Sequence, residues 1–263
     1  MTKIAFLGTG AMGSRMAARL CAEHDVTVWN RSEDRIPASL LSTGARPAAT
    51  PADAADGADV VVAMVRDDTA SRSVWLDGTL DAMAPGALAV ECSTLSIAWI
   101  RELGRAAEDR TIRFCEAPVA GSRPQAEAGQ LIHLVGGEPD TVAALAPILA
   151  ITGDATHHLG PVGAGMAMKL IVNGLFGIQL AAIAELLALG ESLGISPELA
   201  LATLAATPIL SPAGRISGEA MVGGQLRPGL PHRARRQGLG PDHGGGGLAS
   251  GRSRDVRGRR SLP

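Results

Sequence analysis

The chain has 263 residues, 46% hydrophobic and 19% charged, so it can bury a core and does not belong to the disordered class. The formal net charge of −2 conceals an asymmetry. Residues 226–263 carry nine arginines against two aspartates, a net +7, so the preceding 225 residues carry −9.

Apolar runs that end in turns predict the strands of a parallel sheet covered on both faces. These runs are residues 4–7, 26–29, 59–65, 88–91, 112–115 and 131–135. Segments with helical spacing lie between them, among them residues 11–23, 69–75 and 97–107. This alternation predicts an α/β fold, a Rossmann-type doubly wound sheet, over residues 1–162.

From residue 163 the pattern becomes helical. Residues 164–193 predict one long helix, and residues 197–206 and 212–222 predict shorter helices that begin near a proline. The long helix contains Asn173, Gln179, Glu185 and Glu191, which are costly in lipid, so we expect a buried helix and not a membrane span. We therefore expect residues 163–224 to form an all-α domain, and this domain is only partial.

The first turn carries a glycine pattern of the dinucleotide-binding type. Gly8, Gly10 and Gly13 follow a strand and open a helix, which is the context that this motif requires. Gly8 permits the tight turn, Gly10 lets the backbone approach a pyrophosphate, and Gly13 lets the helix pack closely on the sheet. The pyrophosphate would rest on the amides at the helix start, where Ala11 and Met12 lie.

The end of the second strand indicates which dinucleotide binds. NAD enzymes place an acidic residue there, whereas this chain has Asn30, Arg31 and Ser32. A carboxylate would repel a 2′-phosphate, but Arg31 can pair with it and its two neighbours can donate hydrogen bonds. We therefore expect NADP(H), with NAD(H) less favoured.

Lys169 is one of only two lysines, the other being Lys3, although the chain has 24 basic residues. It lies in a mostly apolar helical segment, and Asn173 follows four residues later on the same face. A lysine in a desolvated cleft has a lowered pKa and can act as an acid or base. A lysine that extends from a buried helix to solvent is the structural alternative.

Several motifs together resemble the β-hydroxyacid dehydrogenase family, which includes 3-hydroxyisobutyrate dehydrogenases and glyoxylate/succinic semialdehyde reductases. The resemblance covers about residues 2–224. The motifs that carry it are residues 8–18, 29–32, 91–94, 116–122 and 163–169 with Asn173.

The resemblance implies a role for each matched residue. Lys169 would protonate the substrate carbonyl, and Asn173 would orient both. Gly121 and Ser122 would bind the substrate carboxylate, and Thr94 with the Met64 and Val65 backbone would border the nicotinamide ribose. Ala120 departs from the family pattern, where a serine is usual.

These residues imply an oxidoreductase that transfers hydride between NADP(H) and a small hydroxy acid, semialdehyde or keto acid. The expected partner is a small molecule with a carboxylate, without nucleic acid or membrane, and a folded chain is expected to form a homodimer. An imine reductase-like enzyme is one alternative, but that group generally replaces the catalytic lysine. The other is a catalytically dead NADP-binding product of a disrupted gene.

Three cysteines, Cys21, Cys92 and Cys115, match no metal-ligand spacing and leave one unpaired in any disulfide scheme. They predict reduced core residues, no metal site and a cytoplasmic protein. The chain shows no basic leader before its first strand, so no signal peptide is expected.

The segment 225–263 departs from the family pattern. It has nine glycines, nine arginines and no helical or strand period, which predicts a disordered tail. A change of reading frame near Gln225 would explain this departure. Codons can be chosen for residues 225–239 that, read in the shifted frame, encode the Phe-Pro-rich and Lys-Asp-Leu segments that the family has there. Arginine also binds nucleic-acid phosphate, but this tail has no aromatic residue for base stacking.

Overall fold

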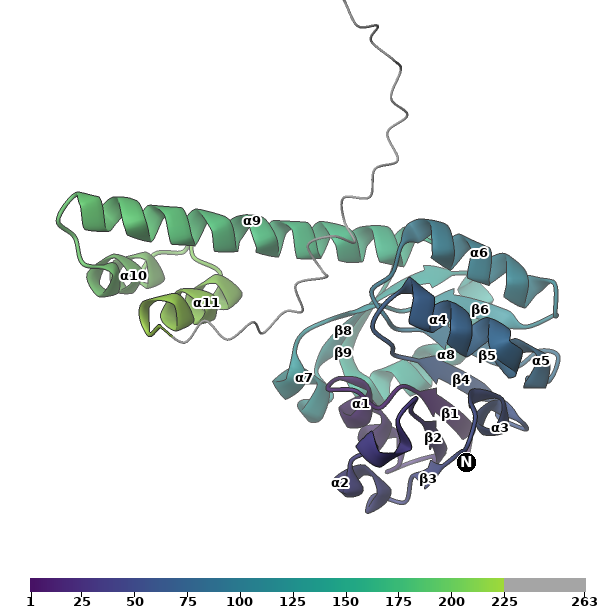
Figure 1. Ribbon diagram of the computed structural model, residues 1–263. Coiled ribbons are helices and arrows are strands. Elements are labelled where there is room, and N and C mark those ends of the chain that lie inside the picture. The colour runs from purple at the N-terminus through teal and green to yellow at the C-terminus, as the bar shows by residue number, and fades with distance from the viewer. Residues whose placement is uncertain (225–263) are drawn as a thin grey trace, which may run out of the picture.

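The computed structural model describes residues 1–224, which form an α/β lobe from which one long helix extends (Figure 1). The predictions for residues 225–263, a disordered tail and a changed reading frame, lie outside the described residues.

Within the described residues, nine strands form one sheet in the order β3-β2-β1-β4-β5-β6-β8-β7, with β9 pairing to β8. The strands are β1 (Lys3–Leu7), β2 (Asp25–Trp29), β3 (Arg46–Pro47), β4 (Val60–Ala63), β5 (Leu88–Glu91), β6 (Arg113–Glu116), β7 (Val119–Ala120), β8 (Leu131–Gly137) and β9 (Gly153–His158). Strands β1 to β6 pair in parallel, whereas β8 runs antiparallel to β6 and β7. The strand order reverses beside β1, so the crevice for a ligand opens at the carboxyl ends of β1 and β4.

Helical segments connect the strands and cover both faces of the sheet (Figure 1). They are α1 (Gly13–Leu20), η1 (Glu33–Arg35), α2 (Ala38–Leu41), α3 (Pro51–Ala55), α4 (Asp68–Val74), η2 (Trp75–Thr79), α5 (Leu80–Ala82), α6 (Ile97–Glu108), α7 (Arg123–Ala128) and α8 (Pro139–Thr152). Beyond the sheet follow α9 (Ala164–Ser192), α10 (Pro197–Ala205) and α11 (Pro212–Val222).

The core has two layers because successive side chains of a strand point to opposite faces. In β1, Ile4 and Phe6 pack in the layer that contains residues of α1 and α8. Ala5 and Leu7 pack in the other layer, with residues of α3, α4 and α6. The uninterrupted apolar runs in the sequence are thus strands buried on both faces, and the predicted doubly wound fold is confirmed.

Helix α9 matches its predicted bounds, but the prediction that it is buried is wrong for the single chain. Only Gly165, Met166, Ile183 and Leu187 are buried along its 29 residues. Its first turns pack on β8 and its distal half packs against α10 and α11, and these contacts leave much of its apolar surface exposed (Figure 1). By length and composition α9 is also the one helix of the described residues that could cross a membrane, with mean hydropathy 1.9 in its most apolar 18-residue window.

Candidate active site

The glycine turn after β1 has the geometry that its sequence predicts. Gly8 has φ +104°, and a Cβ there would overlap the Met64 carbonyl oxygen at the end of β4. A Cβ at Gly13 would overlap the Gly8 carbonyl oxygen, so only glycine lets α1 start this close to the strand. At Gly10, by contrast, a Cβ would have no neighbour within 4 Å among the described residues, so space is open where a pyrophosphate would approach.

Two further features of this turn fit a bound phosphate group. The N-cap of α1 is Met12, whose side chain makes no capping hydrogen bond, so no N-cap side chain competes with an anion at the helix start. The Thr9 hydroxyl is buried and has no hydrogen-bond partner within residues 1–224. A buried donor without a partner is costly, and a phosphate oxygen of a dinucleotide would satisfy it.

At the end of β2 the three predicted residues have different surroundings. Asn30 accepts a hydrogen bond from the Thr9 amide at 3.3 Å and donates one to the Ser32 carbonyl oxygen at 2.7 Å. Its side chain thus joins the glycine turn to the segment that follows β2, a structural role that the sequence did not predict. Arg31 is exposed and makes no hydrogen bond or ion pair to the described chain, so its guanidinium is available to a ligand.

Glu91, at the end of β5, organises the segments that carry Met64, Val65 and Thr94. It is fully buried and accepts hydrogen bonds from the Ser71 hydroxyl, the Trp75 indole and the Ser93 amide, at 2.6, 2.9 and 2.9 Å. Burial raises the pKa of Glu91. The Ser93 hydroxyl in turn accepts a hydrogen bond from the Val65 amide at 2.7 Å, which ties the end of β4 to the end of β5.

The loop that follows β6 places Gly121 and Ser122 at the surface beside the short strand β7. Gly121 has φ +125°, a conformation that favours glycine. The Ser122 amide donates to the Gln125 side chain at 2.9 Å, so this amide is already bonded within the chain and only the Ser122 hydroxyl remains to donate to a carboxylate.

Lys169 and Asn173 are partly buried on α9, one and two turns beyond Gly165. Burial lowers the pKa of the Lys169 ammonium. The turn before Lys169 is tied to the end of β5, because the Leu95 amide, next to Thr94, contacts the Met166 sulfur at 3.2 Å. Lys169 therefore stands on a helix turn that is held against the Thr94 segment.

The predicted site residues follow the carboxyl ends of β1, β2, β4, β5 and β6 or lie on the first turns of α9. Arg31 follows β2, and Thr94 follows β5, with β1 and β4 between these strands. An extended dinucleotide placed across this edge would have its adenosine ribose near Arg31 and its nicotinamide near Thr94. Sequence reasoning missed Glu91 and Glu116, acids that directly follow buried apolar residues at the ends of β5 and β6, a position that is itself a signal.

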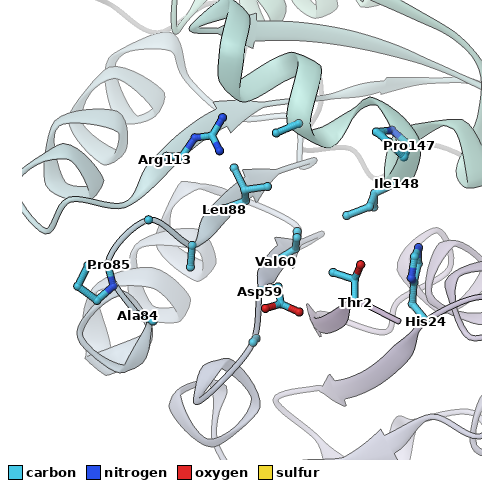
Figure 2. A pocket seen from close by; sticks show the side chains of 14 residues that line it. Thr2, His24, Asp59, Val60, Ala84, Pro85, Leu88, Arg113, Pro147 and Ile148 are labelled. Atoms are coloured by element: carbon cyan, nitrogen blue, oxygen red, sulfur yellow. The ribbon is translucent and has the colours of Figure 1, made fainter.

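A pocket at the opposite edge of the sheet is unrelated to this arrangement (Figure 2). Thr2, His24, Asp59 and Arg113 line it together with apolar residues from the starts of β4 and β5 and from α8. It contains none of the predicted site residues. Ligands of open α/β sheets bind at the carboxyl ends of the strands, so this pocket is not the candidate active site.

Comparison with known proteins agrees with this geometry. Residues 3–171 match the family model described as the NAD binding domain of 6-phosphogluconate dehydrogenase. The chain is 35% identical over 222 residues, 83% of its length, to glyoxylate/succinic semialdehyde reductase 2, chloroplastic, of Arabidopsis thaliana, and spans 62% of that relative. It is 37% identical to 3-hydroxyisobutyrate dehydrogenase of Pseudomonas aeruginosa, covering 75% of this chain and 67% of that one.

A solved structure gives the same result for the fold. The 3-hydroxyisobutyrate dehydrogenase of Mycobacterium tuberculosis, determined with L-serine, superposes with a TM-score of 0.77 at 29% identity. The superposition covers 88% of this chain and 81% of that one, so it extends beyond the sheet into the helical region.

Proposed function

The chain belongs to the β-hydroxyacid dehydrogenase family, and we propose that it is an NADP(H)-dependent oxidoreductase of small carboxylate-bearing hydroxy acids and the corresponding semialdehydes or keto acids. One observation carries the catalytic part of this proposal. Lys169 is the lysine that is partly buried on the helix beside the crevice, whereas Lys3 is exposed at the start of β1.

Lys169 supplies the acid and base chemistry at the substrate oxygen. In reduction its ammonium donates a proton to the carbonyl oxygen, and in oxidation its neutral amine accepts the hydroxyl proton. Desolvation lowers the pKa of Lys169, so the ammonium and the neutral amine interconvert closer to neutral pH. Asn173, one turn further on the same helix face, would orient the ammonium and the substrate.

The residues around the crevice fit a nicotinamide dinucleotide, which when bound would supply or accept the hydride. Gly10 and the start of α1 would hold the pyrophosphate, with Ala11 and Met12 contributing backbone donors. The Met64–Val65 backbone and Thr94 would border the nicotinamide ribose. The bonds that Glu91 and Ser93 make would keep those two segments at a fixed separation.

We further propose that the cofactor is NADP(H) in preference to NAD(H). Support comes from Arg31, which is exposed, free of an ion pair within residues 1–224, and able to bind a 2′-phosphate bidentately. Arg35 in η1 is a second exposed cation on the same segment, which the sequence reasoning did not single out. Ser32 is partly buried and can add a hydroxyl donor.

The substrate carboxylate would bind at Gly121 and Ser122. Since the Ser122 amide is bonded to Gln125, the Ser122 hydroxyl and the Gly121 amide are the donors that we assign to the carboxylate. The Ala120 position provides no hydroxyl, which favours a substrate that needs fewer donors at this point.

The exposed apolar face of α9 supports a homodimer. Ile171, Leu175 and Ile178 are 63%, 58% and 69% exposed, and a contiguous apolar surface of this kind marks an interface. Light scattering is expected to give twice the mass of the chain, and Ile178→Glu is expected to give a single chain.

The test of this function is consumption of NADPH by the full chain with a panel of small semialdehydes and keto acids. Lys169→Ala is expected to lower kcat by roughly a hundred- to ten-thousandfold, because a positioned general acid contributes this much. Lys3→Ala is the matched control and is expected to match the wild type, since this side chain is exposed. The panel also contains a cyclic imine.

Three outcomes would contradict the proposal. Wild-type binding of NADPH without turnover of any panel member would indicate a cofactor-binding protein without catalysis. Turnover of the imine alone would favour an imine reductase. Equal rates in the wild type and Lys169→Ala would remove Lys169 from the chemistry.

A further inference from the structure

Glu116 makes contacts that the proposed chemistry does not use. It ends β6, is fully buried, and is the first residue of the segment that leads through β7 to Gly121 and Ser122. Its Oε1 accepts hydrogen bonds from the Gly163 amide at 2.7 Å and from the Gly165 amide at 3.1 Å. These two amides belong to the N-cap and the first turn of α9.

This carboxylate replaces a cap that the helix lacks. The N-cap of α9 is Gly163, with φ +102°, and it has no side chain that could accept from the first turn. The first amides of a helix have no partner within the helix, and leaving them unsatisfied in a buried place is costly. Glu116 therefore caps α9 from 47 and 49 residues away in the sequence.

The space around the carboxylate is closed by glycines. A Cβ at Gly136, on the paired strand β8, would overlap Glu116 Oε1. A Cβ at Gly165 would overlap the Leu134 carbonyl oxygen, also on β8. The first turn of α9, the strand β8 and the Glu116 side chain thus approach one another so closely that only glycine fits at positions 136 and 165.

We propose that Glu116 is a positioning residue for Lys169: its carboxylate holds the first turn of α9, and so the ammonium one turn later, against the loop that carries Gly121 and Ser122. This inference rests on the proposed role of Lys169. The consequence is that Glu116 fixes the relative position of two segments. One is the substrate loop, which starts at Glu116, and the other is the helix that carries the acid. Glu116 does not touch the substrate in this arrangement.

The matched variants are Glu116→Leu and Glu116→Gln. Leucine fills a similar volume and removes the acceptor, so the Gly163 and Gly165 amides lose their partner. Glutamine keeps one acceptor oxygen in the same place and is expected to preserve the position of the helix. Gly136→Ala approaches the same contact from β8, because its methyl group would displace the carboxylate without removing its charge. Glu108→Gln, an exposed acid on α6, is the control.

The first readout is hydrogen exchange of the amides at the start of α9. Glu116→Leu and Gly136→Ala are expected to speed exchange of the Gly163 and Gly165 amides roughly ten- to hundredfold, the effect of losing hydrogen bonds to a charged group. Glu116→Gln and Glu108→Gln are expected to stay within a few-fold of the wild type. This readout requires neither cofactor nor substrate.

The second readout is the pKa of Lys169, measured from the pH dependence of its labelling by acetic anhydride. The chain has only two lysines, so Lys3 serves as an internal reference for an exposed amine. In the wild type Lys169 is expected to titrate below Lys3. In Glu116→Leu, where the first turn is released and solvated, its pKa is expected to move toward that of Lys3.

The outcomes separate this inference from the proposed function. If Lys169 titrates like Lys3 in the wild type, the proposed acid loses its support and this inference falls with it. If Lys169 titrates below Lys3 in the wild type and equally in Glu116→Leu, only the positioning role is refuted. Two further results would overturn the positioning role. If Glu116→Gln behaves like Glu116→Leu, the charge of Glu116 and not its acceptor oxygen is what matters. If Glu116→Leu shows no cooperative melt, Glu116 maintains the whole fold and not the position of one helix.

Discussion

Burial favours the neutral form of both Lys169 and Glu116, so it shifts their pKa values in opposite directions. The pKa of Lys169 is lowered, and burial raises the pKa of Glu116 to about 7, against the effect of the Gly163 and Gly165 amides, which favour the charged form. Both groups are therefore closer to titrating near neutral pH than they would be in an unfolded chain.

Glu116 predicts a pH dependence of stability. Its pKa in the folded chain lies above its ordinary value of 4.5, so its contribution is fully present below about pH 4.5 and is lost as the pH rises through about 7. From about pH 5 to about pH 8 the wild type is expected to lose stability relative to Glu116→Gln, which does not titrate, on the order of 1–3 kcal/mol. Melting temperatures of the two proteins across this range test it, and parallel curves would contradict it. Glu91 is present in both proteins, so its contribution cancels in the comparison.

At the residue scale, the sequence predicts the groups expected to act on substrate or cofactor, but it does not predict the groups that position them. Lys169 was conspicuous because the chain has so few lysines, and Arg31 because it follows a strand at the ribose position. Glu91 and Glu116 lie within recognised motifs, but their roles depend on partners far away in the sequence, such as Gly163 for Glu116. Asn30 was predicted as a ligand donor, and its bond to Ser32 is a contact that only the folded turn reveals.

At the element scale, the glycine turn after β1 combines two different requirements. Gly13 allows close packing within the protein, whereas a Cβ at Gly10 would meet no atom of the described residues within 4 Å, so the space there is open to a ligand. The glycine pattern was readable from the sequence because the strand before it and the helix after it were both predictable. The apolar pattern does not predict strand β9 (Gly153–His158), because this strand is largely polar and exposed. Helix α8 is likewise not singled out in the sequence.

Gly10→Ala and Gly13→Ala are therefore expected to fail in different ways. Gly10→Ala should melt close to the wild type but bind NADPH about tenfold or more weakly, ~1.4 kcal/mol, because its methyl group occupies the approach to the pyrophosphate. Gly13→Ala should lose about 1–3 kcal/mol of stability, since its methyl group overlaps the Gly8 carbonyl oxygen. Thermal melts with fluorescence titration of NADPH separate the two. An unstable Gly10→Ala with normal affinity would refute the assignment of the open space.

At the scale of the whole molecule, the α/β lobe satisfies its own packing and the helical region does not. The lobe buries apolar layers on both faces of its sheet, whereas within residues 1–224 the distal half of α9 packs only against α10 and α11. The bounds of α9 were predictable from local pattern, but its burial was predicted wrongly because burial depends on what covers a helix. A second copy of the chain is the cover that we propose.

The measurement that bears most directly on a nucleotide-dependent enzyme is the melting temperature of the purified full chain alone, with NADPH and with NADH. A ligand that binds only the folded state stabilises it by about 2.7 kcal/mol at a hundred times its Kd, which shifts the melt by several degrees. We predict a cooperative melt that NADPH raises more than NADH does at equal concentration. No shift with either nucleotide would contradict the cofactor site, and a larger shift with NADH would contradict the role of Arg31.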